Sequence, residues 1–346
     1  MGDRLKAILL FLPAAFLLLQ CASSATGAAG AAGASGDGGS GSSGALSPGA
    51  GAASQAPAGS AAEGPEDREE RPSIDVSSPV VVLDALVQAY PDRVTDLAIR
   101  NGDWSVLIDG RAFHWAGGRM LSAEELDRSD SYSPYSFRPY PEDVQPVPDL
   151  SPEDVARLKA RINQREAGLD GRSPAFLIAM WGMATFADAE VQVRPQRFLG
   201  RNIRVNPRIS GFLEAVEADI LAAAETDPET AAWLETLGPI GAYVWRDIAG
   251  SANRSLHSFG IAVDIQPRSY GGKQAYWRWA ADYYDAWWSV PLEDRYRPPA
   301  AVIEAFERHG FTWGGKWFLY DQIHFEYRPE LHVLAARTAS DRRGDR

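Results

Sequence analysis

The chain has 346 residues, of which 45% are hydrophobic, enough to bury a sizeable core. Its formal net charge of −12 argues against nucleic acid as a partner, because nucleic-acid binding requires a basic face. A single cysteine excludes internal disulfides and metal sites built from several cysteines.

The first 21 residues have the pattern of an export signal. Arg4 and Lys6 precede the apolar run Ala7 to Leu19, which is too short to cross a bilayer comfortably. Cys21 follows this run and is itself followed by small residues, an arrangement that resembles a bacterial lipoprotein processing site. Two outcomes stay open: a membrane tether through lipidated Cys21, or ordinary cleavage near Ala25 that discards it. In both cases we expect an exported protein of the periplasm or cell envelope.

Residues 22–72 have the composition of a linker. They are mostly Ala, Gly, Ser and Pro and end in a patch of mixed charge, so they cannot bury a core. We therefore predict a disordered linker here, followed by one domain over residues 73–336 whose motif core spans 240–330. The polar residues 337–346 are predicted to form a frayed tail.

The first part of the domain is predicted to contain a helix and a hairpin. Val80 to Ala89 indicates a short helix. Asp109-Gly110 separates the apolar runs Trp104–Ile108 and Arg111–Trp115, which is a hairpin signal. His114 has no partner at ligand spacing, so we interpret it as a packed or a surface histidine and not as a ligand.

Further helices are indicated by capping residues and by apolar periodicity. Ser151-Pro152-Glu153 combines an N-cap, a proline at the first helical position and an acidic first turn, and predicts a helix through about Gln164. Residues 131–148 are expected to be extended, and residues 186–209 stay ambiguous between strand and loop. The remaining predicted helices are Pro174–Trp181, Phe212–Leu221, Pro228–Leu237 and Pro298–Arg308.

Residues 273–288 carry an aromatic side chain at nearly every turn. A stripe of this kind at helical spacing indicates a helix packed in the core. Stacking of these rings on the sugars of a glycan is the alternative, and the sequence leaves both open.

The stretch Ser255 to Asp264 places a histidine and a carboxylate seven positions apart, His257 and Asp264. On one helix or one strand this spacing is at least roughly 10 Å, too far for both to bind one metal ion. They can meet only if the chain doubles back, and Gly260 stands where such a bend could occur. Beyond it, β-branched residues at every second position from 261 to 265 predict a strand that turns Asp264 away from the core.

A second strand is indicated near the C-terminus. Apolar residues alternate with polar ones from 323 to 327, so His324 should also face away from the core. His257, Asp264 and His324 form a two-histidine, one-carboxylate set, which suits a catalytic zinc with one open position. Asp321 precedes His324 by three residues and is expected to reach the site from the loop that enters the strand.

These residues resemble the zinc peptidases of the D-Ala-D-Ala dipeptidase and carboxypeptidase family, which also contains phage L-alanyl-D-glutamate endopeptidases. The family pattern Ser-x-His-x-x-Gly-x-Ala-x-Asp is matched by Ser255-Leu-His257-Ser-Phe-Gly260-Ile-Ala262-Val-Asp264. A Gly-rich aromatic stretch and an acidic-x-x-His motif follow, as Gly310 to Trp317 and Asp321-Gln-Ile-His324. Asp rather than Glu at 321 is similar to the endopeptidase branch.

The resemblance implies roles for two charged side chains. Asp321 would act as general base toward the attacking water and then protonate the leaving amine. The family places an arginine at the end of a comparable strand, and that role maps onto Arg246, because Gly241 to Trp245 is predicted to be a strand. Arg254 is the rival and could instead bind the substrate.

Two further residues near the motif have alternative roles. Ser255 could donate a hydrogen bond to the substrate or cap the turn before His257. Glu326 shares a strand face with His324 and would orient that imidazole from behind. It is also the second candidate for the base.

We therefore expect an α+β fold in which an antiparallel sheet carries a Zn²⁺ site and helices pack on its other face. The resemblance implies a zinc metallopeptidase that hydrolyses peptidoglycan stem peptides, as an L,D-endopeptidase or as a D-Ala-D-Ala carboxypeptidase. The alternative is a non-catalytic zinc-containing envelope protein that binds peptidoglycan. Serine acylation and nucleotide chemistry have little support, since Gly-x-Ser-x-Gly and phosphate-binding loop motifs do not occur.

Overall fold

The computed structural model describes residue 75 and residues 77–344, with side chains through residue 340. The predicted export signal with Cys21 and the predicted linker 22–72 lie outside the described residues. Among the helices that are described, none combines the length and the apolar character needed to cross a membrane.

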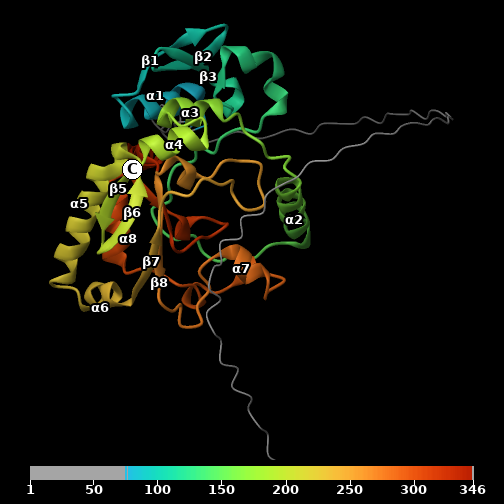
Figure 1. The fold of residues 1–346 in the computed structure, drawn as a ribbon. Helices are drawn as coiled ribbons and strands as arrows, with labels where there is room; N and C mark the ends of the chain where they lie inside the picture. Colours follow the sequence, from blue (N-terminus) through green and yellow to red (C-terminus); the bar gives the residue numbers. More distant parts are fainter. Residues whose placement is uncertain (1–74, 76, 345–346) are drawn as a thin grey trace, which may run out of the picture. The chain divides into compact units, whose positions relative to one another are not determined.

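The N-terminal part of the described chain is a helix beside an antiparallel sheet of order β1-β2-β3-β4 (Figure 1). The predicted hairpin is confirmed, with Asp109 and Gly110 at φ 50° and 78° between β2 and β3. A second hairpin joins β1 to β2 through Asn101-Gly102, a turn signal that the sequence analysis missed. The elements are α1 (Pro79–Ala89), β1 (Val94–Arg100), β2 (Asp103–Ile108), β3 (Arg111–His114) and β4 (Leu121–Ser122).

His114 on β3 is fully buried, and neither of its ring nitrogens has a hydrogen-bond partner among the described residues. It does not belong to the group of side chains that could hold a metal. Of the two alternatives for His114, a packed or a surface histidine, the structure therefore shows the packed one.

The middle of the chain is mainly helical. Ser151 caps α2 as predicted, because its hydroxyl accepts a hydrogen bond from the amide of Asp154 at 3.1 Å. The ambiguous residues 186–209 form a helix and the β5-β6 hairpin. The elements are α2 (Pro152–Glu166), α3 (Ala175–Trp181), α4 (Phe186–Gln192), β5 (Arg194–Phe198), β6 (Arg201–Val205), α5 (Pro207–Ala224) and α6 (Pro228–Thr236).

The C-terminal part contains an antiparallel sheet of order β7-β8-β10-β9. We call it the motif sheet, because β8 and β10 carry the two halves of the zinc-site pattern. Its elements and the neighbouring helices are β7 (Leu237–Gly241), η3 (Leu256–Phe259), β8 (Ala262–Pro267), α7 (Trp277–Ala281), α8 (Ala300–Arg308), β9 (Phe311–Trp313), β10 (His324–Tyr327) and α9 (Pro329–Gly344).

The prediction of a strand from Gly241 to Trp245 is wrong, because the strand β7 ends at Gly241. The backbone that follows bonds elsewhere: the amide of Tyr243 donates to the carbonyl of Arg204 on β6, and the amide of Val244 donates to the carbonyl of His257. These contacts take residues 243 and 244 away from β8, so Arg246 does not stand at the end of a strand.

Two other predicted elements need correction. The aromatic residues 273–288 contain only the five-residue helix α7 and a short 3₁₀ turn, although Trp277, Trp287 and Trp288 do form a buried cluster as expected of a core. Residues 337–344 of the predicted frayed tail are instead part of α9, which continues to Gly344.

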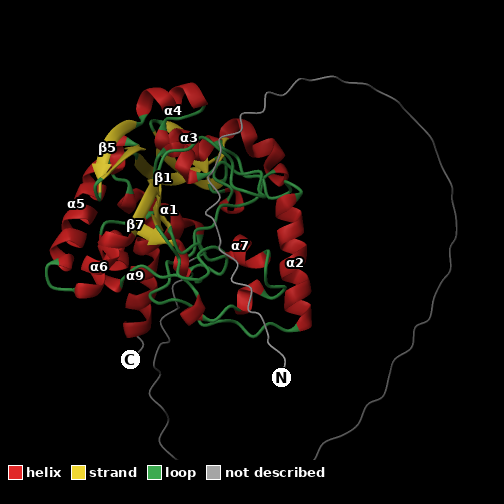
Figure 2. Cartoon of the chain, turned by 60° about the horizontal axis from the view of Figure 1, so that its bottom comes forward, coloured by secondary structure: helices red, strands yellow, loops and turns green. Residues whose placement is uncertain are grey.

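The motif sheet has one apolar and one polar face. On the apolar face Phe306 of α8 stacks on Phe325 of β10, with ring centroids 4.0 Å apart. Figure 1 shows α5 and α8 on one side of β7 and β8, and Figure 2 shows α2 and α7 on the other side of the domain. The predicted α+β class, with an antiparallel sheet backed by helices, is confirmed.

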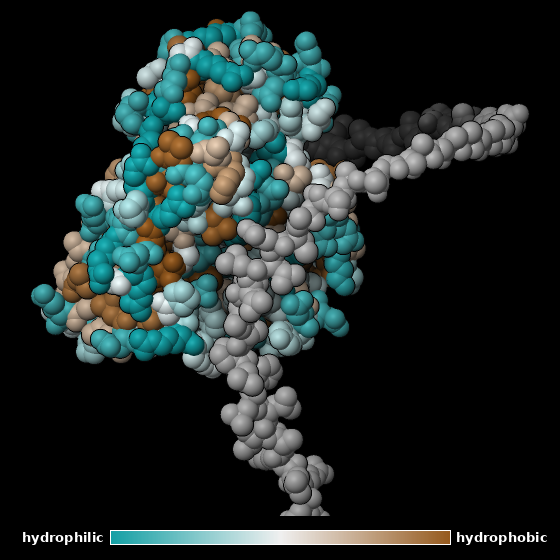
Figure 3. All heavy atoms as spheres, in the orientation of Figure 1, coloured by the Kyte–Doolittle hydropathy of each residue, from teal (hydrophilic) through white to brown (hydrophobic). Residues whose placement is uncertain are grey.

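The N-terminal sheet and the motif sheet share one hydrophobic core, which α1 and α9 join by packing against each other. On the face drawn in Figure 3, small hydrophobic patches are separated by hydrophilic side chains. Most of the apolar side chains that stabilise the described domain are thus in its interior.

Candidate metal centre

The pairing of β8 with β10 places Asp264 directly opposite His324. Cβ atoms of opposite residues point to the same face of a sheet, so both side chains leave the face that helix α8 does not cover. The alternation predicted for both strands is observed, since Val263, Ile265 and Phe325 are fully buried on the opposite face.

His257 reaches the same place because the chain bends sharply at Gly260. This glycine ends the 3₁₀ turn η3 in the left-handed conformation, with φ 63°. A Cβ atom at this position would lie 2.7 Å from the amide nitrogen of Asn206. The bend makes β8 double back on the turn η3. His257 and Asp264 therefore come together, although they are seven positions apart in the sequence.

The three predicted ligands converge on one point. His324 Nδ1 lies 2.8 Å and His257 Nε2 lies 3.2 Å from Asp264 Oδ1, and the two ring nitrogens are 3.3 Å apart. One ligand atom from each side chain lies within 4.8 Å of those of the other two, so this His/Asp/His group could hold a metal ion.

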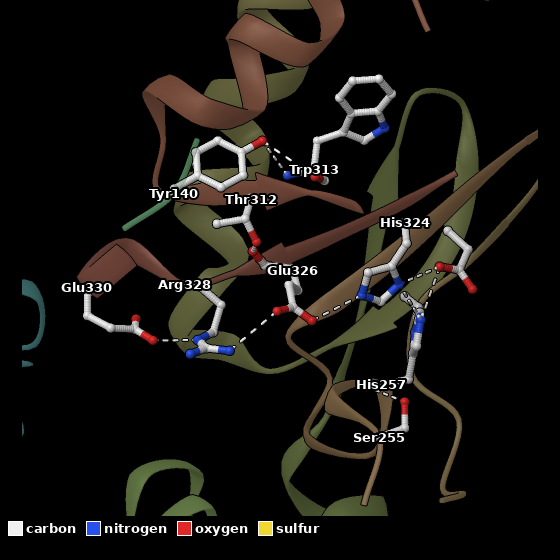
Figure 4. A network of polar contacts seen from close by, with 11 residues as sticks. Tyr140, Ser255, His257, Thr312, Trp313, His324, Glu326, Arg328 and Glu330 are labelled. Atoms are coloured by element: carbon white, nitrogen blue, oxygen red, sulfur yellow. Dashed lines mark hydrogen bonds and ion pairs between the residues drawn. The ribbon is translucent and has the colours of Figure 1, made fainter. Parts of the chain in front are cut away.

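Contacts behind the imidazoles select which nitrogen faces this point. His257 Nδ1 lies against the carbonyl of Ala242, which can only accept, so Nδ1 carries the proton and Nε2 is free as a ligand. His324 Nε2 lies 3.2 Å from a carboxylate oxygen of Glu326, which leaves His324 Nδ1 for a metal (Figure 4). Glu326 is thus placed behind His324 as the shared strand face predicts.

The charges of the cluster support one another. Burial alone would raise the pKa of Asp264, yet the adjacent His257 and His324 hold it well below its usual range. Burial opposes protonation of His324, but its hydrogen bonds to Asp264 and Glu326 raise its pKa well above the ordinary value. Without a metal, the carboxylates of the site therefore favour the protonated, positively charged form of His324.

Asp321 lies in the loop before β10, as the sequence suggested. Its amide donates to the carbonyl of Gly314 at 3.0 Å, an approach that only glycine permits, because a Cβ at 314 would lie 2.5 Å from the carbonyl oxygen of Asp321. Its Oδ1 is buried and has no hydrogen-bond partner among the described residues. Burial, reinforced by the negative charge of Asp264, raises the pKa of Asp321 to about 7.

The remaining predicted residues lie around the loop that precedes η3. The hydroxyl of Ser255 accepts a hydrogen bond from the amide of His257 at 3.3 Å, so it caps the turn. Arg254 pairs with Asp247 at 3.1 Å and stacks over the ring of Trp245. Arg246 is exposed, and its guanidinium donates a hydrogen bond to the backbone carbonyl of Asp247 at 3.3 Å.

Two tyrosines near the cluster were missed by sequence reasoning. Tyr276 forms an isolated antiparallel bridge with Asp321. The hydroxyl of Tyr270 is buried without a partner in the described part of the chain, and its pKa is raised by burial and by the charges of Tyr296, Asp321 and Asp264. Tyr276 belongs to the aromatic stretch that was interpreted as core, and nothing in the sequence set these two rings apart.

Two imidazoles and a carboxylate converge on one point, and the charges of all three act on the nearby Asp321, one oxygen of which has no partner among the described residues. This arrangement is typical of metallopeptidase sites. Residues 249–327 match a family described as D-alanyl-D-alanine carboxypeptidase, so this C-terminal segment is similar to that family. Residues 82–137 match a second family, described only as a domain of unknown function. Searches of curated proteins and of solved structures found no match.

Proposed function

We propose that this protein is a zinc-dependent peptidase that hydrolyses peptidoglycan stem peptides. The family of its C-terminal segment supports a metallopeptidase acting on substrates of the D-Ala-D-Ala type. The observation that carries the catalytic proposal is the buried carboxylate oxygen of Asp321, which has no partner among the described residues and lies close enough for the charges of Asp264, His257 and His324 to act on the group. A binding-only protein has no need for such a group, because an unpaired buried carboxylate costs stability.

The residues present fit zinc. Two imidazole nitrogens and one carboxylate oxygen are the donor set that catalytic zinc sites use, and the two imidazoles are oriented from behind by Ala242 and Glu326. Zinc, when bound there, supplies a Lewis acid that polarises the scissile carbonyl and makes water acidic enough to lose a proton near neutral pH.

Asp321 is the proposed general base. Its carboxylate takes the proton of the attacking water and then delivers it to the nitrogen of the leaving amine as the peptide bond breaks. A pKa near 7 suits both steps, because the group can then accept and release a proton at similar cost. Glu326 is less suited, since His324 and Arg328 already occupy its two oxygens.

Arg246 is proposed as the cation for the oxyanion on the resemblance alone, since the strand that suggested it ends at Gly241; such a donor is typically worth ~3 to 4 kcal/mol. Arg254 is less suited, since Asp247 and Trp245 hold its guanidinium. Tyr270, whose hydroxyl is buried and unpartnered in the described chain, is proposed to donate a hydrogen bond to the substrate. Ser255 keeps its capping role and could offer its hydroxyl proton as well.

The experiment is digestion of purified muropeptides by the zinc-loaded protein, with products identified by mass. Release of D-alanine alone marks a carboxypeptidase, and cleavage within the stem peptide marks the endopeptidase that Asp321 favours. Zinc binding without any release of amines would instead support the non-catalytic peptidoglycan-binding protein. Export to the cell envelope, where such peptides occur, is part of the proposal and rests on the sequence of residues 1–21.

A further inference from the structure

A network of buried polar contacts leads from the metal centre through Glu326 and Arg328 to Glu330 (Figure 4), and from there to Tyr90 in the N-terminal part of the domain. Glu326 accepts from His324 through one oxygen and from Arg328 through the other, at 3.2 Å and 3.4 Å. Arg328 is in turn paired with Glu330 at the start of α9. Tyr90, which ends α1, donates its hydroxyl proton to Glu330 at 2.7 Å.

The side chains of this network are largely shielded from water and hold one another in place. The side chain of Glu330 is 3% exposed, and those of Glu326 and Arg328 are 13% and 20% exposed. Arg328 also donates to the carbonyl of Ser136 at 3.2 Å. Every carboxylate in this network has a cation or a hydroxyl on it, and Arg328 is the guanidinium that joins Glu326 to Glu330.

The two ends of this polar network lie in segments that match different sequence families. Tyr90 and Ser136 both lie within residues 82–137, the match to a domain of unknown function, whereas His324 and Glu326 lie within residues 249–327. The polar contacts thus join the two matched segments at the back of a metal ligand. Apolar packing of α1 on α9 would be possible without these polar contacts, because such packing does not need any charged group to be buried.

We propose that Arg328 and Glu330 are positioning residues, through which residues 79–137 hold Glu326 against His324 and so set the affinity of the site for its metal. The proposal rests on the metal centre of the proposed function. Glu326 can fix the tautomer and ring angle of His324 only while its own carboxylate is held. Arg328 holds it, and Glu330 with Tyr90 and Ser136 holds Arg328.

The test compares Arg328→Met and Glu330→Gln with Arg337→Met in the full chain. Arg337 is a matched control, because it also joins α9 to α1, through Val81 and Asp84, but has no contact with β10 among the described residues. Zinc affinity is measured by competition with a chromogenic chelator, the ligand field by the visible spectrum of the cobalt form, and stability by Tm.

We expect Arg328→Met and Glu330→Gln to weaken zinc binding about tenfold or more and to alter the cobalt spectrum. Arg337→Met should lower Tm and leave both metal readouts unchanged. If the two charge variants lower Tm like the control while zinc affinity and spectrum stay those of the wild type, the proposal is overturned.

Tyr90→Phe covers the case in which a charge variant does not fold. It removes only the hydroxyl and keeps the ring, which packs on Trp181 and Tyr327. We expect zinc to bind about two- to fivefold more weakly, because one hydrogen bond at the end of the polar network is lost. An unchanged affinity counts against the proposal. Absence of zinc binding by the wild type would refute the metal centre itself, which separates the two failures.

Discussion

Asp321 and Glu326 are the two carboxylates closest in sequence to His324, and their surroundings differ. Both oxygens of Glu326 are engaged, by His324 and by Arg328, and these partners lower its pKa against the effect of burial. Asp321 has an oxygen with no partner in the described chain and a raised pKa. The difference assigns orientation of the imidazole to Glu326 and proton transfer to Asp321.

Asp321→Asn should therefore retain zinc, because Asp321 is not one of the three ligands, yet lose ~10² to 10⁴ in kcat. Zinc content and kcat on a muropeptide substrate measure the two effects separately. The assignment fails if Glu326→Gln gives this pattern while Asp321→Asn remains close to wild type.

Asp321 should also make the stability of the metal-free protein depend on pH. The pKa of Asp321 is raised to about 7 in the folded protein, whereas it is about 4 in the unfolded chain. The contribution of Asp321 to the free energy of unfolding is therefore fully present below a pH of about 4 and is lost as the pH rises to and through about 7. In chelator, wild type should lose stability relative to Asp321→Asn between pH 5 and pH 8, as measured by urea unfolding. Parallel pH profiles of the two proteins would show that Asp321 is not protonated in the folded state.

Tyr270→Phe tests the hydroxyl proposed to face the substrate. Loss of one hydrogen bond of about 1.4 kcal/mol should lower kcat/KM about tenfold with Tm unchanged. Tyr320→Phe is the control, because its hydroxyl is likewise buried without a partner among the described residues, but its ring lies against Arg295 in the separate tryptophan cluster. Equal effects of the two substitutions would remove Tyr270 from the site.

The element that decides the geometry of the site is the turn from η3 into β8. It needs Gly260 for two reasons, a left-handed backbone and a space that a Cβ would overfill against Asn206. Since β8 is held on both sides by β7 and β10, the turn cannot relax without moving His257 or Asp264.

Gly260→Ala should thus lower stability by more than the roughly 1 kcal/mol expected for left-handed strain alone, and should weaken zinc binding. Gly271→Ala is the matched control, because Gly271 has a similar φ of 59° but nothing within 4 Å of an added Cβ. Tm and zinc affinity are measured for both. Similar losses in the two variants would mean that the close approach to Asn206 is unimportant.

At the scale of the whole molecule, the motif sheet is one part of a larger core. Leu331 and Leu334 of α9 are buried in the same cluster as Val82 and Leu86 of α1, so the segment before the peptidase motif stabilises the motif from behind. This arrangement gives the N-terminal part a structural role in addition to the polar contacts that end on Glu326.

The location of the protein is a separate prediction, which concerns residues outside the described structure. If Cys21 is the lipidated N-terminus, Cys21→Ser should move the protein from the membrane to the soluble fraction, since loss of the acyl chains removes the anchor. Fractionation of cells followed by immunoblotting measures this. Identical partitioning of both forms would favour ordinary cleavage near Ala25.

Local patterns in the sequence were sufficient to predict the metal-ligand group. Alternating apolar residues identify the faces of β8 and β10, and Gly260 marks the bend, so His257, Asp264 and His324 could be assigned to one site before any fold was known. The hairpin at Asp109-Gly110 was predicted for the same reason, because its turn conformation depends on two adjacent residues.

Contacts between segments distant in the chain could not be predicted in this way. The strand before Arg246 was misplaced because its limits depend on hydrogen bonds to β6 and to the turn at His257. Tyr90 and Glu330 are 240 positions apart and form a hydrogen bond, and neither residue carries a local signal for the other. Such pairings depend on which surfaces pack together, and this follows from burial of the whole core rather than from the spacing of any one motif.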